Sequence, residues 1–240
     1  MAGACFYAGA ASAAPRRAVR RVPRPNAGPP PPPLPSTSLG IAGKDFAVIA
    51  ADTRLSEGYS ILSRAVSRAA LLTPRCVVAT GGCHTDVATL HKVLGMASAR
   101  YALAHEAAPS TPALAQLLST TLYGRRFMPY YAFNVVAGLD AEGRGAVYTY
   151  DAVGSYERVA YAAQGSGQKL IIPLLDNIVG GKNRADRTPP AELAVDEAVA
   201  LAIEAFVTAG ERDMYTGDAV EIFVITAAGT RKQIFALKKD

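Results

Sequence analysis

The sequence predicts an α+β fold, a four-layer αββα sandwich in which two antiparallel sheets lie between two layers of paired helices. Two observations carry this prediction. Strand-like and helix-like segments follow one another in the order ββ, β, αα, βββ, αα, ββ. Strands joined by short turns pair antiparallel, and helices that come in pairs can cover the outer face of a sheet. The 240 residues are enough for one compact domain of this kind.

The first strands are expected shortly after residue 36. Two apolar runs, residues 38–42 and 46–51, flank the segment Gly43-Lys44-Asp45. A short polar turn that contains glycine, between segments that favour strands, predicts a β-hairpin. Residues 76–80 predict one further strand.

Helical periodicity begins at Thr85. Apolar residues recur there at intervals of three and four, which is typical of one buried helix face: Val87, Leu90, Val93, Leu94 and Ala97. A second helix is expected to begin at Ser110, because a capping residue is followed by Pro112 in the first turn, and to run to about Tyr123.

The second half repeats the alternation of strands and helices. Strands are predicted at residues 132–138, 146–150 and 159–163, and a helix at 168–176. A longer helix over residues 192–209 shows an apolar stripe of Val195, Val199, Ile203 and Phe206. Strands at 220–226 and 232–237 close the chain. No repeat of 20 to 50 residues is evident.

Residues 1–35 differ from the rest in proline and charge. Nine of the 16 prolines precede Ser36, and this segment contains five arginines and no acid. A proline run such as residues 29–33 cannot build a packed core, so we expect a disordered extension or a removable propeptide, with an organelle-targeting peptide as the alternative. Residues 36–240 are expected to be the folded domain.

Composition argues against several classes of protein. Without the five tail arginines, 20 basic residues face 20 acidic ones, so the body is neutral, whereas a nucleic-acid-binding domain is expected to have a basic face. No stretch reaches the roughly 18 uncharged apolar residues of a membrane-spanning helix. Three cysteines are too few for a disulfide framework and fit a reducing compartment.

No metal or organic cofactor is expected. The candidate ligands Cys76, Cys83, His84 and His91 match no compact zinc spacing. Gly165-Ser166-Gly167 lacks both the third glycine of a dinucleotide loop and a following Gly-Lys-Ser/Thr, so we interpret it as a turn from strand to helix.

Three segments considered together are more informative: Asp52-Thr53-Arg54, Gly165-Ser166-Gly167 and residues 211–218. They resemble the β-type subunits of the 20S proteasome, which are N-terminal-nucleophile hydrolases. Longer stretches carry the resemblance more specifically, and it extends over essentially residues 36–240. These stretches are residues 52–61, 123–131, 138–156, 173–177 and 237–240.

The resemblance implies a mechanism for the active members of the family. Removal of a propeptide exposes a threonine, whose hydroxyl attacks a peptide carbonyl while its own α-amine transfers the proton. A lysine and an aspartate set the electrostatics, a glycine N–H stabilises the oxyanion, and a serine with a second aspartate orders the site. The corresponding positions in this sequence are Ser36, Asp52, Arg68, Gly82, Ser166, Asp213 and Thr216.

Three of these positions depart from what catalysis requires. Ser36, 16 residues before Asp52, stands in place of the threonine, and Pro35 precedes it where self-cleaving members have glycine. Arg68 replaces the lysine and does not exchange protons near neutrality. Thr216 stands where serine is usual and Asp218 replaces a common glycine, while Thr37 is one residue off the nucleophile spacing and is interpreted as an ordinary strand residue. We therefore expect no catalytic residue, and a structural Asp52–Arg68 salt bridge.

The function that the resemblance implies is that of a non-catalytic β-ring subunit of the 20S core particle. Such a subunit contacts other β subunits in a seven-membered ring, the α ring and the opposite β ring. The particle degrades ubiquitin-tagged proteins in an ATP-dependent pathway in cytoplasm and nucleus. Two alternatives stay open: an active serine- or threonine-type peptidase formed by external trimming of the tail, and an unrelated monomeric α/β binding domain.

Overall fold

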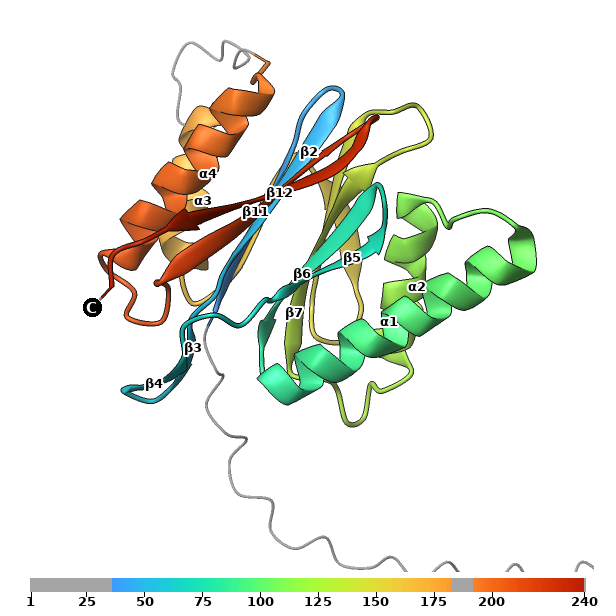
Figure 1. The fold of residues 1–240 in the computed structure, drawn as a ribbon, viewed down its shortest axis with the longest axis horizontal. Coiled ribbons are helices and arrows are strands. Elements are labelled where there is room, and N and C mark those ends of the chain that lie inside the picture. Colours follow the sequence, from blue (N-terminus) through green and yellow to red (C-terminus); the bar gives the residue numbers. More distant parts are fainter. Residues whose placement is uncertain (1–35, 183–191, 240) are drawn as a thin grey trace, which may run out of the picture. The chain divides into compact units, whose positions relative to one another are not determined.

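The computed structural model of the chain describes residues 36–182 and 192–239. The predicted extension or propeptide, residues 1–35, lies outside the described residues. Within the described part, four helices accompany two five-stranded antiparallel sheets and one short two-stranded sheet (Figure 1). The prediction of an α+β fold with antiparallel sheets and two pairs of helices is confirmed.

The first sheet brings the two ends of the described chain together. The predicted N-terminal hairpin is confirmed and forms its middle, where Leu39 pairs with Ala50. The strand order is β10 (Tyr161–Gly165), β1 (Thr37–Ala42), β2 (Phe46–Asp52), β11 (Ala219–Thr226) and β12 (Gly229–Ala236). Since β1 pairs with β10 and β2 with β11, the start of the chain is held between strands from its second half.

The second sheet is built in simple chain order. Its strands are β5 (Ala69–Thr73), β6 (Cys76–Gly82), β7 (Ala132–Leu139), β8 (Gly145–Tyr150) and β9 (Tyr156–Val159). The sequence predicted no strand between residues 52 and 75, whereas the structure has β3 (Leu55–Glu57), β4 (Ser60–Ser63) and β5 there. These strands have three to five residues each, too few to show a clear alternation of apolar and polar positions.

The predicted strand over residues 159–163 is wrong as a single element. Val159 ends β9 in the second sheet and Tyr161 begins β10 in the first, so the chain passes from one sheet to the other at Ala160. The carbonyl of Ala160 still accepts a hydrogen bond from the Ala42 amide at 2.8 Å. A run of strand-favouring residues does not reveal that its two halves pair with different partners, which are β8 and β1.

The four helices lie close to the predicted ranges. They are α1 (His84–His105), α2 (Thr111–Tyr123), α3 (Gln168–Ile178) and α4 (Val195–Gly210). The Ser110 side chain caps α2 as predicted, accepting a hydrogen bond from the Ala113 amide at 3.4 Å. The last helix begins three residues later than predicted, at Val195, because Ala194 has an extended backbone.

Three buried apolar clusters hold these elements together. The first joins α3 and α4 to one face of the first sheet, and the second joins α1 and α2 to the second sheet (Figure 1). The third contains side chains from both sheets. Alternation along β2 divides its residues, because Val48 and Ala50 belong to the first cluster while Ala47, Ile49 and Ala51 belong to the third. No helix in the described ranges combines the length and hydropathy needed to cross a membrane.

Candidate functional site

Ser36, at the predicted nucleophile position, lies buried where the two sheets approach each other. Its hydroxyl accepts a hydrogen bond from the Gly82 amide at 3.3 Å, and its carbonyl accepts one from the Ser166 amide at 3.2 Å. Gly82 has a φ of +121°, and a Cβ there would lie 2.3 Å from the carbonyl oxygen of Tyr131. The glycine at the predicted oxyanion position is therefore required by the backbone geometry itself.

Thr37, the first residue of β1, takes part in a chain of hydroxyl hydrogen bonds. Thr216 donates to the Asp213 carboxylate at 2.8 Å, and the hydroxyls of Thr37 and Thr216 are 2.6 Å apart. Because a hydroxyl has only one proton to donate, Thr37 must donate to Thr216. The Gly167 amide, at the start of α3, completes the chain by donating to the Thr37 hydroxyl at 2.9 Å.

Asp52 and Arg68 form a buried pair at the end of β2. One Asp52 oxygen accepts a hydrogen bond from the Thr37 amide at 3.0 Å and lies 3.9 Å from Arg68 Nε. Arg68 is 1% exposed and donates from one terminal nitrogen to the carbonyl of Arg54 at 2.7 Å. Within the part of the chain that the structure describes, its Nε and its other terminal nitrogen donate no hydrogen bond. The predicted salt-bridge contact is thus present, but as a charge contact without a hydrogen bond.

Burial dominates the electrostatics of this pair. It raises the pKa of Asp52 from 3.8 to about 7, against the opposing charge of Arg68 and the hydrogen bond from Thr37. It also lowers the pKa of Arg68, which Asp52 partly offsets. A guanidinium nevertheless starts so far above neutrality that Arg68 keeps its proton near pH 7.

The protection of the Thr37 amide against hydrogen exchange is expected to fall as pH rises. Below about pH 4, Asp52 is protonated whether the strand is closed or open, so its titration does not change the equilibrium between the two forms. Between about pH 4 and 7, opening releases a proton from Asp52. The ratio of the closed to the open population therefore falls up to tenfold per pH unit. Exchange measured by mass spectrometry, normalised to the intrinsic rate, tests this slope. The Asp52→Asn variant should lack it, and an equal slope in that variant would contradict the assignment.

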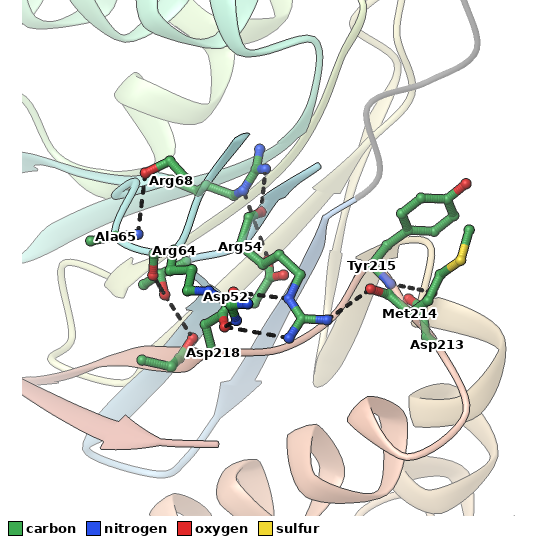
Figure 2. A network of polar contacts seen from close by, with 12 residues as sticks. Asp52, Arg54, Arg64, Ala65, Arg68, Asp213, Met214, Tyr215 and Asp218 are labelled. Atoms are coloured by element: carbon green, nitrogen blue, oxygen red, sulfur yellow. Dashed lines mark hydrogen bonds and ion pairs between the residues drawn. The ribbon is translucent and has the colours of Figure 1, made fainter. Parts of the chain in front are cut away.

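A second charged network, which the sequence did not predict, fixes the loop that contains Asp213 (Figure 2). Arg54 donates from Nε to Asp218 at 2.9 Å and from a terminal nitrogen to the carbonyl of Met214 at 2.9 Å. Arg64 also donates to Asp218, whose side chain is only 2% exposed. Burial tends to raise the pKa of Asp218, but hydrogen bonds and charge from the two arginines outweigh it and hold that pKa below its usual value.

Of the residues considered as metal ligands, His91 makes a different polar contact. His91 lies 2.8 Å from the Thr80 hydroxyl, and burial, with a smaller effect of His84, lowers its pKa to about 4. Burial raises the pKa of the Cys76 thiol to about 12. Across residues 36–182 and 192–239, no three His, Cys, Asp or Glu side chains are grouped so as to hold a metal ion.

Comparison with known proteins identifies the family of this chain. Residues 34–225 match the family described as "Proteasome subunit". The chain belongs to the proteasome subunit family. It is 51% identical to "Proteasome subunit beta type-1" of Oryza sativa subsp. japonica, over 85% of this chain and 94% of that protein. It is 47% identical to "Proteasome subunit beta type-1-B" of Carassius auratus and 43% identical to the beta type-1 subunit of Drosophila melanogaster, over 85% and 84% of this chain and 86% of each relative.

The positions carried over from proteasome subunits make two sets of contacts, one around Ser36 and one around Thr37. Ser36 lies with Gly82 and with the backbone of Ser166, whereas Asp213 and Thr216 lie with Thr37. The Ser166 hydroxyl, although buried, makes no hydrogen bond with the described residues.

Thr37 makes more polar contacts than its place in the sequence indicated. It links Asp52 through its amide to Gly167 and Thr216 through its hydroxyl, so it is more than an ordinary strand residue. A polar side chain directly beside the expected nucleophile position was the available signal. Its neighbours could not be identified from spacing, because Thr216 is 179 positions away.

Proposed function

We propose that this chain is a non-catalytic, structural β-type subunit of the 20S proteasome core particle. The observation that carries the proposal is the buried guanidinium of Arg68 at the position where the family's active members have lysine. It retains its proton near neutrality and lies 3.9 Å from a carboxylate that burial favours in its neutral form. A site of this kind is poorly suited to exchange the protons that acyl transfer requires.

The nucleophile position supports the same conclusion. In the sequence the nitrogen of Ser36 is joined to Pro35 as an amide, and an amide cannot act as the general base that a free α-amine provides. Proline also crowds the carbonyl that Ser36 would attack to release itself. Because Ser36 is 1% exposed and its carbonyl is bound by the Ser166 amide, the start of the strand is held as part of the sheet.

Membership of the proteasome subunit family supports the structural role. We propose that the domain spans residues 36–240, with residues 1–35 as an extension or propeptide, and has the αββα layering of the N-terminal-nucleophile hydrolases. It contributes to a seven-membered β ring and contacts its ring neighbours, the α ring and the opposite β ring. The assembled particle degrades ubiquitin-tagged proteins in an ATP-dependent pathway, in cytoplasm and nucleus. Neither a metal nor an organic cofactor takes part.

The competing proposal is an active peptidase in which Ser36 becomes the first residue after external trimming. The hydrogen bond between the Gly82 amide and the Ser36 hydroxyl favours it, since the amide could turn to a developing oxyanion. The mass of the mature N-terminus and of its inhibitor adduct separates the two proposals.

Assembled particles treated with a covalent inhibitor directed at N-terminal threonines should contain this subunit at its unmodified mass. Other β subunits in the same sample should gain the adduct and so serve as the internal control. The variant Ser36→Ala should leave every peptidase activity of the particle within about twofold of the original, since the removed hydroxyl takes part in no rate-limiting step. An adduct on a peptide that begins at Ser36 or Thr37 would show that the site is active.

A further inference from the structure

The end of α2 and its connection to β7 expose an unusual set of side chains. Tyr123, Phe127 and Met128 are 60%, 90% and 81% exposed, and Arg125 and Arg126 lie between them in the chain. These five residues are called the α2–β7 surface below. Single exposed apolar residues are ordinary, but three large ones within six positions of a folded chain indicate a site of interaction.

Backbone hydrogen bonds hold this segment in one conformation. The amides of Arg125, Arg126 and Met128 each donate to the carbonyl three residues earlier, at 3.0, 3.0 and 2.8 Å respectively. At the far end, the Tyr131 amide donates to the Asp86 carboxylate on α1 at 2.9 Å. The exposed side chains are therefore presented by an ordered turn, which reduces the entropy that binding costs.

The arginines are oriented by the aromatic rings around them. The Arg126 guanidinium lies 5.5 Å from the ring centre of Phe127 and 5.9 Å from that of Tyr123, and Arg125 lies 4.5 Å from that of Tyr130. Residues 123–133 contain two arginines and no acidic residue, so this segment has a net positive charge of its own. Tyr, Phe, Met and Arg are the types enriched in protein interfaces, and Tyr and Arg are frequent hot spots.

We propose that the α2–β7 surface binds a neighbouring proteasome subunit, through a segment of that subunit in which acidic side chains flank an apolar pocket. The inference rests on the proposed function, because only an assembled subunit has such a neighbour. The positive charge requires acidic groups on the partner, and the exposed Phe127 and Met128 require apolar contact. Nucleic acid is the less suitable occupant because residues 36–240 have equal numbers of basic and acidic residues.

The test uses the assembled particle and four variants of this chain, one of which is a control. Phe127→Ser with Met128→Ser should reduce incorporation into full-size particles at least about tenfold. Arg126→Glu should reduce it in the same direction, whereas Arg126→Lys should retain most of it. Leu103→Ser is the matched control, since Leu103 is 85% exposed on α1 and lies outside the surface. It should leave incorporation unchanged.

Two further measurements, oxidation of Met128 and crosslinking from position 127, compare the surface in the isolated chain and in the intact particle. Met128 in the intact particle should resist oxidation by dilute peroxide at least about tenfold better than in the isolated chain, while Met96, 56% exposed on α1, serves as the comparison. A photo-crosslinker in place of Phe127 should join one other subunit, at a peptide that contains Asp or Glu. Equal oxidation of Met128 in both states, or a crosslink only to a second copy of this chain or to nucleic acid, would overturn the inference. Failure of the unaltered chain to enter particles at all would instead refute the proposed function.

Discussion

Replacing Gly82 with alanine is expected to remove most of the correctly folded chain. The φ of +121° at this position is rarely adopted by residues with a side chain, and the new Cβ would lie 2.3 Å from the Tyr131 carbonyl oxygen. Backbone strain and overpacking together should cost about 3 kcal/mol or more. The amount of this chain incorporated into purified particles, and the thermal stability of those particles, would measure the loss.

Gly95→Ala is the matched control, because it makes the same chemical change elsewhere. Gly95 lies in α1, is exposed, and has no atom within 4 Å of a Cβ built on it. Alanine favours a helix over glycine, so this variant should gain up to about 1 kcal/mol. If the two variants shifted stability in the same direction, the geometric argument for Gly82 would be wrong.

Replacing Asp218 with alanine is expected to have an effect of similar size for an electrostatic reason. It would leave the Arg54 side chain, only 3% exposed, without its carboxylate and would remove a contact of Arg64. Breaking a buried ion pair on one side typically costs about 3 to 5 kcal/mol. Limited proteolysis should then cut the segment 211–218 sooner, because Arg54 also holds the carbonyl of Met214.

Two further variants separate charge from backbone effects at Asp218. Its φ is +67°, which asparagine tolerates well, so Asp218→Asn removes the charge with little added strain. We expect Asp218→Asn to lower the stability of the protein nearly as much as Asp218→Ala does. Glu142→Ala removes an exposed partner of Arg144 and should change stability by less than about 1 kcal/mol. A mild effect of Asp218→Asn would mean that the carboxylate charge contributes little.

The elements with strong local signals were predictable from the sequence. The N-terminal hairpin has an apolar run on each side of a glycine turn, and α2 has both a capping serine and a proline in its first turn. These features depend on residues close together in the chain. β3, β4 and β5 have no comparable local pattern, and the change of sheet at Ala160 depends on which distant strands pair.

The candidate site divides in the same way. The resemblance to proteasome subunits indicated which positions to examine, including Asp52, Arg68 and Gly82. It did not indicate that the Thr37 hydroxyl would join Gly167 and Thr216, or that Arg54 and Arg64 would share one carboxylate. Those contacts arise from three-dimensional packing of segments more than 100 residues apart, which periodicity and spacing along a single sequence do not record.

The pairing of β1 and β2 with strands from the end of the chain has a consequence for biosynthesis. The contact between Thr37 and Thr216 spans 179 positions, and a ribosome adds about 5 to 20 residues per second. The N-terminal hairpin therefore waits roughly 10 to 40 seconds, by that rate, before β10 and β11 can cover its two open edges. Unpaired strand edges are the usual starting points of aggregation, and contacts between distant residues also slow folding itself. The nascent chain is therefore expected to expose aggregation-prone strand edges until its last strands have emerged.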